Sequence, residues 1–126
     1  MFYHKFSLNG YIHNLHHSDW YAGKLVGLAI IKYHNLNLNV YVTHLHANYS
    51  DNYDVNEFSD IYLAHRVSQL YELGQFIKQT SDSGDMSILL GDLNTCDNEN
   101  GYKLLRVHSD LLDAYRERLV IYYLYS

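Results

Sequence analysis

Two polar side chains follow a short apolar run in the sequence Gly91-Asp92-Leu93-Asn94. Asp92 and Asn94 are two residues apart, so in extended backbone both side chains project to one side. A carboxylate and an amide there can hold a metal-bound water and a phosphate oxygen, and hard cations such as Mg²⁺ choose oxygen ligands. A simple turn is the alternative interpretation, because Asp and Asn are common after strands.

A second polar pair ends the segment Thr43-His44-Leu45-His46. Its spacing predicts that His44 and His46 share one strand face. His44 could act on a phosphate by hydrogen bond or proton donation. Alternatively the pair could bind zinc, although no third and fourth ligand stand at a convincing spacing. The third interpretation is two half-exposed histidines at the end of a strand.

Three further residues near these segments carry weaker signals. Asp19 and Lys24 flank a loop, and a solvated ion pair is their default interpretation. Cys96 lies just past Asp92 and is interpreted as a bystander.

The charged residues of the main predicted helix are interpreted mostly as a solvated face. Arg66, beside His65, could still reach the site. The four charges concerned are Asp60, Arg66, Glu72 and Lys78.

Composition and absent motifs exclude several classes of protein. A net charge of −5 is a poor match to nucleic acid and a good match to a site that gathers divalent cations. No Gly-x-Ser-x-Gly frame surrounds Ser83 or Ser87, which argues against a serine hydrolase. The single cysteine excludes an internal disulfide. No apolar run has the length of a signal peptide or of a membrane span.

The elements that must position these residues follow from apolar periodicity. Residues 25–31 form an apolar run that predicts a buried strand. Residues 36–43 alternate, which predicts a hairpin with the preceding run and one buried face of Leu36, Leu38, Val40 and Val42. A helix is predicted over about residues 60–79, with Ile61, Ala64, Val67, Leu70, Leu73 and Ile77 at helical spacing.

The remaining elements complete an α/β pattern. A short strand is predicted over 86–90 and a short helix near 98–107. Residues 10–17 give only a weak strand signal. No linker or repeat divides the chain, so one domain is predicted.

Several of these segments together resemble the neutral sphingomyelinase branch of the endonuclease/exonuclease/phosphatase superfamily, whose fold is DNase I-like. Gly-Asp-Leu-Asn at 91–94 marks the superfamily. Thr-His-Leu-His-Ala at 43–47 and Tyr-Leu-Ala-His-Arg at 62–66 are much more specific to the branch. The match also includes 10–13, 16–24 and Asp113-Ala114-Tyr115, and runs from about residue 9 to 117.

The resemblance implies a four-layer α/β sandwich and Mg²⁺-dependent hydrolysis of sphingomyelin, or a related choline phospholipid, to ceramide and phosphocholine. By motif position, Asp92 and Asn94 would hold the attacking water and the phosphoryl group, and His44 would stabilise the transition state or its leaving oxygen. Asp19 and Lys24 match a loop pair that would adjust the site. The family implies action at a membrane surface, on the cytoplasmic side of intracellular membranes, and no nucleic-acid partner.

Departures from the family pattern predict an incomplete site. A metal-binding Glu in an N-terminal Gln-Glu motif and a general-base His in a C-terminal Ser-Asp-His motif have no match in this chain. Residues 1–117 are therefore interpreted as the central portion of the domain, and 118–126 as a divergent tail. An inactive fragment, or a related nuclease or phosphoinositide phosphatase of the same fold, is the alternative.

Overall fold

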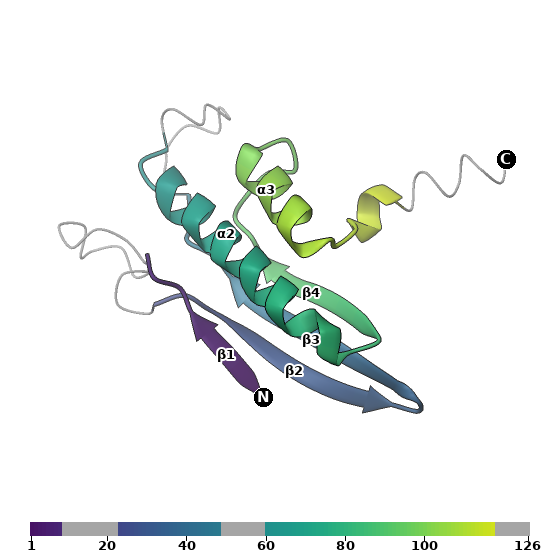
Figure 1. The fold of residues 1–126 in the computed structure, drawn as a ribbon. Coiled ribbons are helices and arrows are strands. Elements are labelled where there is room, and N and C mark those ends of the chain that lie inside the picture. The colour runs from purple at the N-terminus through teal and green to yellow at the C-terminus, as the bar shows by residue number, and fades with distance from the viewer. Residues whose placement is uncertain (9–22, 49–59, 118–126) are drawn as a thin grey trace, which may run out of the picture.

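The computed structural model describes residues 1–8, 23–48 and 60–117, in which two long α-helices lie on a four-stranded sheet (Figure 1). The strands, in the order β1-β2-β3-β4, span Phe2–Lys5, Leu25–Tyr33, Leu36–His44 and Met86–Asp92. The two longer helices are α2 (Leu63–Thr80) and α3 (Asn100–Ser109), with a short 3-10 helix, η3 (Ser81–Ser83), after α2 and a helical turn over residues 114–117. The α/β class is confirmed. The weak strand at 10–17 and the tail at 118–126 lie outside the described residues.

The predicted hairpin is formed by β2 and β3. Tyr33 pairs with Leu36, so His34 and Asn35 make a two-residue turn, and His34 takes a φ of 54°. Tight hairpin turns favour positive φ because it matches the twist of the strands. β1, which the sequence pattern did not predict, pairs antiparallel with β2. Its four residues are too few to show a period.

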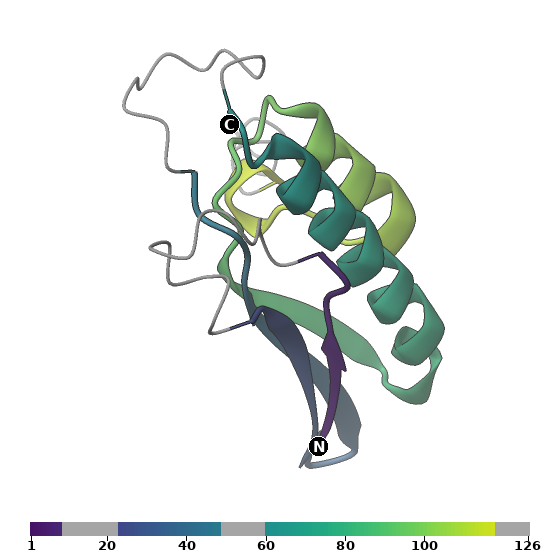
Figure 2. The ribbon, with the colours of Figure 1, turned by 90° about the vertical axis from the view of Figure 1, so that its left-hand side faces the viewer.

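The other strand pair, β3 and β4, is parallel, and α2 forms the crossover between them. Parallel neighbours need such a crossover, which returns the chain to the same end of the sheet. The carboxyl ends of β3 and β4 therefore meet at one edge. Both helices lie on one face of the sheet, and no element of the described part covers the other face (Figures 1 and 2).

Apolar side chains between the sheet and the helices form the core. Two glycines let α2 and α3 approach closely: a Cβ on Gly74 would lie 2.8 Å from Cβ of His108, and one on Gly101 would lie 2.8 Å from Leu70. Neither described helix is long and apolar enough to cross a membrane. The buried core residues are Phe6, Val26, Leu28, Tyr41, Leu45, Leu70, Leu73, Ile77 and Leu105.

The predicted buried face of β3 was wrong. Asn39 and Tyr41 are fully buried beneath α2, whereas Val42 is 53% exposed. The amide of Asn39 donates to the carbonyl oxygens of Thr80 (3.3 Å) and Ser81 (3.2 Å) at the end of α2. Hydrogen bonds of this kind offset the cost of burying a polar side chain, so the helix can cover this face.

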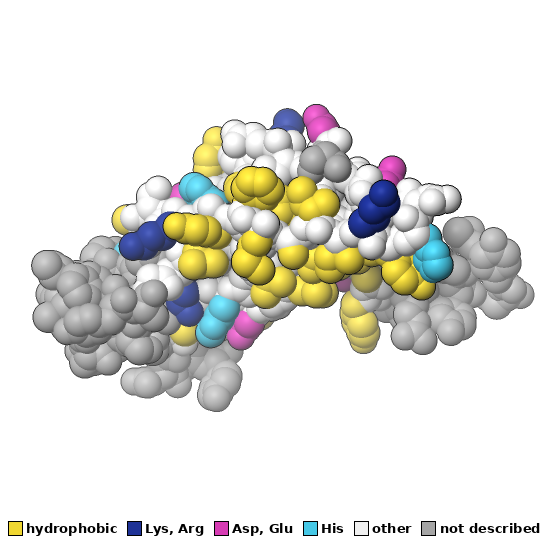
Figure 3. All heavy atoms as spheres, turned by 90° about the horizontal axis from the view of Figure 1, so that it is seen from below, with side chains coloured by type: hydrophobic (Ala, Val, Ile, Leu, Met, Phe, Trp, Pro, Cys, Tyr) yellow, Lys and Arg dark blue, Asp and Glu magenta, His cyan; other side chains and the backbone are white. Residues whose placement is uncertain are grey.

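The apolar residues of β3 lie instead on the open face of the sheet. Figure 3 views the molecule from this side and shows hydrophobic side chains gathered across it. Val42 is flanked there by Gly27 of β2 and by Leu90 of β4, and Leu90 is 51% exposed.

In α2, the predicted stripe holds for the second half of the helix only. Leu70, Leu73 and Ile77 are buried, but Ile61 and Ala64 are exposed. The buried positions in the first half are polar: His65, Arg66 and Gln69.

Candidate active site

His44 and Asp92 are brought together at the carboxyl ends of β3 and β4. Their Cα atoms are register partners in the parallel pair, and both residues are exposed. Neighbouring strands lie about 4.8 Å apart, and register partners project to the same face. A carboxylate and an imidazole therefore stand side by side on the open face of the sheet.

Gly91 allows this close approach of the two strands. Its φ is 130°, and a Cβ there would lie 1.8 Å from the carbonyl oxygen of Thr43, its register partner on β3. No residue with a side chain fits without shifting the backbone. The glycine of the Gly-Asp-Leu-Asn motif thus sets the position of Asp92.

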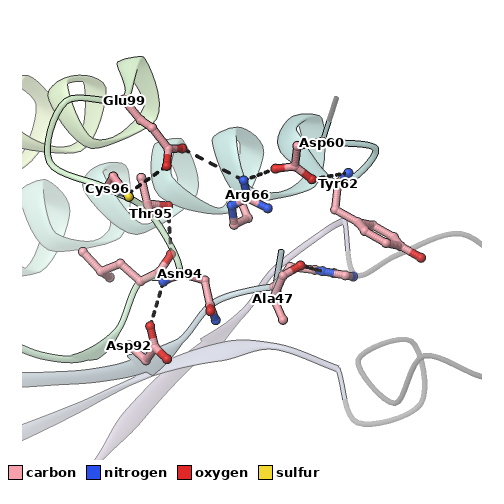
Figure 4. Close-up of polar contacts among 11 residues, drawn as sticks. Ala47, Asp60, Tyr62, Arg66, Asp92, Asn94, Thr95, Cys96 and Glu99 are labelled. Carbon is pink, nitrogen blue, oxygen red and sulfur yellow. Dashed lines mark hydrogen bonds and ion pairs between the residues drawn. The ribbon is translucent and has the colours of Figure 1, made fainter. Parts of the chain in front are cut away.

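The loop after β4 folds back on the two strand ends (Figure 4). The backbone N–H of Asn94 donates to Oδ1 of Asp92 at 2.8 Å, which leaves Oδ2 of that carboxylate without a hydrogen bond within the described part. The side-chain amide of Asn94 donates to the carbonyl oxygen of Leu45 at 3.0 Å. Asn94 takes a φ of 48°, a conformation that Asn tolerates better than most residues. Asn94 is thereby held against the residue that follows His44.

His46 and His44 do not share a face, contrary to the prediction. β3 ends at His44, and the chain then turns so that His46 is buried, with 1% of its surface exposed. Its ring stacks on Tyr62 at 4.3 Å between centroids and lies 5.5 Å from the ring of His65. The described residues contain no group of three or more His, Cys, Asp or Glu side chains that could hold a metal.

The charges of α2 are not a solvated face, apart from exposed Lys78. The side chains of Arg66 and Asp60 are 2% and 5% exposed and form an ion pair. Glu72 accepts hydrogen bonds from the backbone N–H and the hydroxyl of Ser7, at 3.0 and 3.1 Å. Segments distant in sequence cover these groups, and single-sequence charge patterning cannot show that.

Arg66 reaches the loop that carries Asn94. Its Nη2 lies 4.0 Å from Oε2 of Glu99, whose Oε1 accepts the backbone N–H of Cys96 at 2.9 Å (Figure 4). Burial and the Glu99 carboxylate raise the pKa of the Cys96 thiol. The thiol is therefore neutral near pH 7 and a weak nucleophile.

Lys24 lies at the same end of the sheet as His44. It precedes β2, its carbonyl oxygen accepts the N–H of Phe6 at 3.0 Å, and its side chain is largely buried. Asp19, its predicted loop partner, lies outside the described residues.

Sequence reasoning missed Gln69 and Glu99. Gln69 is fully buried, and its Oε1 accepts the backbone N–H of His46 at 2.8 Å. A usable signal was present, because the apolar stripe of Ile77, Leu73 and Leu70 continues backwards through Gln69 and Arg66 at helical spacing. Polar residues on a core stripe mark positions where burial needs a partner.

The hollow of about 1100 Å³ beside β4 is not this site. It runs between β4 and α3 and is lined largely by apolar residues, among them Leu89, Leu93, Leu105 and Leu111. None of His44, Asp92 and Asn94 lines it. Its mostly apolar lining is a poor match to phosphate chemistry, which needs polar groups placed around the developing charge.

Comparisons with known proteins point to one group. No protein-family model matches the chain. It is 48% identical to human sphingomyelin phosphodiesterase 2 over 114 residues, which are 90% of this chain and 26% of the relative. It is 42% identical to a putative neutral sphingomyelinase of Caenorhabditis elegans over 113 residues, 89% of this chain and 25% of the relative. The chain thus spans about a quarter of the length of these relatives.

A solved structure supports the fold. Sphingomyelinase C from Streptomyces griseocarneus matches with a TM-score of 0.55 at 21% identity, over 77% of this chain and 32% of that chain. The four-stranded sheet and its helices are therefore part of a DNase I-like α/β fold. The chain thus fits one part of a neutral sphingomyelinase, by its sequence similarity to these relatives and by its fold.

Proposed function

We propose that this chain supplies one side of the active site of a phosphodiesterase that hydrolyses sphingomyelin to ceramide and phosphocholine at a membrane surface. The observation that carries the proposal is the pairing of His44 with Asp92 at adjacent strand ends, with Asn94 held beside them. The names of the relatives support the substrate class. We further propose the cytoplasmic side of intracellular membranes as the place of action.

Each of the three residues has a distinct task in this reaction. Water adds to phosphorus, the bond to the ceramide oxygen breaks, and that oxygen takes up a proton. Oδ2 of Asp92 accepts a hydrogen bond from the attacking water, and the amide of Asn94 orients the phosphoryl group. The His44 imidazole donates to a phosphoryl oxygen or to the leaving oxygen, where negative charge grows in the transition state.

The donor set fits a magnesium ion that keeps most of its waters. Such ions bind through one or two carboxylates, and Asp92 offers one exposed carboxylate whose Oδ1 alone accepts a hydrogen bond within the described part. The side-chain oxygen of Asn94 offers a second ligand for the ion, because the hydrogen bond to the carbonyl oxygen of Leu45 uses the amide nitrogen instead. A bound Mg²⁺ would polarise the phosphoryl group as a Lewis acid.

The test uses a full-length enzyme in which this chain replaces the matching 114-residue stretch of the human relative. Phosphocholine release from sphingomyelin vesicles is measured with and without Mg²⁺. Asp92→Ala should lower kcat by roughly 100-fold or more, because the removed group acts on the reacting centre. Asp82→Ala, an exposed aspartate on η3, is the matched control and should keep full activity.

Full activity of Asp92→Ala would remove the proposed site. Preference for nucleic acid or a phosphoinositide over sphingomyelin, in direct competition, would keep the site and overturn the substrate.

A further inference from the structure

Arg66 and Gln69 form a buried polar row at the end of α2 nearest the candidate site. Their exposed fractions are 2% and 0%. Neither residue has a task in the chemistry proposed above. Both nevertheless contact the segments that leave the two strands carrying His44 and Asp92.

Gln69 holds the chain after β3. Its Oε1 accepts the backbone N–H of His46 at 2.8 Å, and its Nε2 donates to the carbonyl oxygen of Leu8 at 2.8 Å. His46 is two residues past His44, so this bond fixes the backbone as it leaves the strand. The second bond ties the same side chain to the segment after β1.

Arg66 holds the chain after β4 through Glu99. Nη2 of Arg66 pairs with Asp60 at the start of α2 and lies 4.0 Å from Glu99. Glu99 accepts the backbone N–H of Cys96, which is two residues past Asn94. Figure 4 shows this chain of contacts running from Asp60 to the loop beside Asn94.

Stability is a poor explanation for this polar row. Within the described residues, Nε and Nη1 of Arg66 have no hydrogen-bond partner, and buried donors without partners destabilise a fold. Apolar residues of similar volume often replace buried ion clusters without loss of stability. The row does give the two strand ends a common anchor, and they also bond to each other through Asn94 and Leu45.

We infer that Arg66 and Gln69 are positioning residues that hold the strand ends bearing His44 and Asp92 in catalytic register. The inference rests on the proposed function. α2 packs its core face against the sheet, and both loops bond to this one helix, so it can hold them at a fixed separation. Misplacement of reacting groups by about 1 Å is enough to slow an enzyme strongly.

The test compares two glutamines of α2 in the same full-length chimera. Gln69→Met removes the bond to His46, whereas Gln75→Met removes a bond to the side chain of His108, which joins α2 to α3 away from the strand ends. Gln69→Met should lower kcat by roughly 10- to 100-fold with KM changed by less than about 3-fold. Gln75→Met should leave both constants near those of the parent at a similar melting temperature.

A conservative variant separates positioning from folding. Gln69→Glu keeps an oxygen that accepts the His46 N–H but buries a charge. Activity should therefore rank parent, Gln69→Glu, Gln69→Met, whereas melting temperature should rank Gln69→Glu lowest. A purely structural role predicts that activity follows melting temperature, and that order would overturn the inference. If the Gln69 variants do not fold, Glu99→Gln still tests whether α2 positions the strand end that carries Asp92.

Glu99→Gln tests the Arg66 branch. It keeps an oxygen for the Cys96 N–H and removes the ion pair, so a fall in kcat without a rise in KM is expected. If Glu99→Gln has the same kcat and KM as the parent, Arg66 is not a positioning residue. If Gln69→Met and Gln75→Met have the same kcat and KM, Gln69 is not a positioning residue. Asp92→Ala in the same chimera distinguishes failure of the proposed function from failure of the positioning role. Full activity of Asp92→Ala would overturn the proposed function, whereas the comparison of Gln69→Met with Gln75→Met would still measure positioning.

Discussion

On the face of the sheet that α2 covers, Asn39 and Thr43 are buried, whereas on the open face Val42 and Leu90 are about half exposed. The hydroxyl of Thr43 donates to the carbonyl oxygen of Leu25 at 2.9 Å, as the amide of Asn39 donates to the end of α2. Burial on the covered face thus depends on hydrogen-bond partners. The hydrophobicity of the strand residues alone therefore does not decide which face of the sheet the helices cover.

The open face has the composition of a sheet that packs against a second layer. Sheets stacked face to face bury apolar residues of both inner faces, as the two sheets of the four-layer sandwich expected from the sequence would. His44 and Asp92 continue the rows of Val42 and Leu90 on this same face. The candidate site therefore lies at the margin of an apolar surface, where a second layer would exclude water from it.

The largest expected difference between the two faces comes from a pair of valines. Val26 is 0% exposed on the covered face and Val42 is 53% exposed on the open face. Val26→Ala should lower the free energy of unfolding by about 2 kcal/mol, because it leaves a cavity in the core. Val42→Ala should lower it by less than about 0.5 kcal/mol. Urea denaturation of this chain measures both, and equal losses would contradict the assignment of the faces.

A pair of asparagines on β3 tests the hydrogen bonds of the covered face. Asn39→Ala removes two bonds to the end of α2 and should cost about 1–2 kcal/mol. Asn37 is exposed, so Asn37→Ala is the control and should cost less than about 0.5 kcal/mol. A stability of Asn39→Ala equal to that of Asn37→Ala would mean that those bonds contribute nothing, and thermal melts of the two variants decide it.

The smallest effect on the free energy of unfolding is expected at a contact outside the sheet, between Tyr102 of α3 and Asp113. The phenol of Tyr102 donates to Asp113, which lowers the pKa of Asp113, while burial and that bond raise the pKa of Tyr102 to about 12. The lowered carboxylate pKa stabilises the fold above the ordinary value of 3.8, and this contribution disappears as the pH falls below it. The raised phenol pKa stabilises the fold below pH 10.0, and this contribution disappears as the pH rises towards 12.

Tyr102→Phe should therefore cost under about 1 kcal/mol at neutral pH, since the pair is partly solvated. The loss should become smaller as the pH falls below 3.8 and Asp113 takes up a proton. A stability difference between the variant and the parent that stays constant from pH 3 to pH 7 would rule out this linkage. Denaturation at a series of pH values measures it.

Periodicity and motif were enough to predict the hairpin, α2, β4 and the placement of Asp92 and Asn94 after a strand. Such features depend on residues close in sequence, through the period of two, the period of 3.6 and the turn residues. The candidate residues His44, Asp92 and Asn94 could also be named from sequence, because the motifs that contain them are contiguous. Their catalytic roles remain predictions for the experiments above.

Tertiary structure alone decided which face of β3 is buried, how His44 and His46 separate, and how Arg66 and Gln69 reach the loops. Each of these depends on contacts between residues far apart in the sequence, such as Gln69 with His46, 23 positions away, and with Leu8, 61 positions away. A polar residue gives the same local pattern whether it faces water or a buried partner. Only the packing of α2 against the sheet distinguishes the two cases, because only then is the partner present.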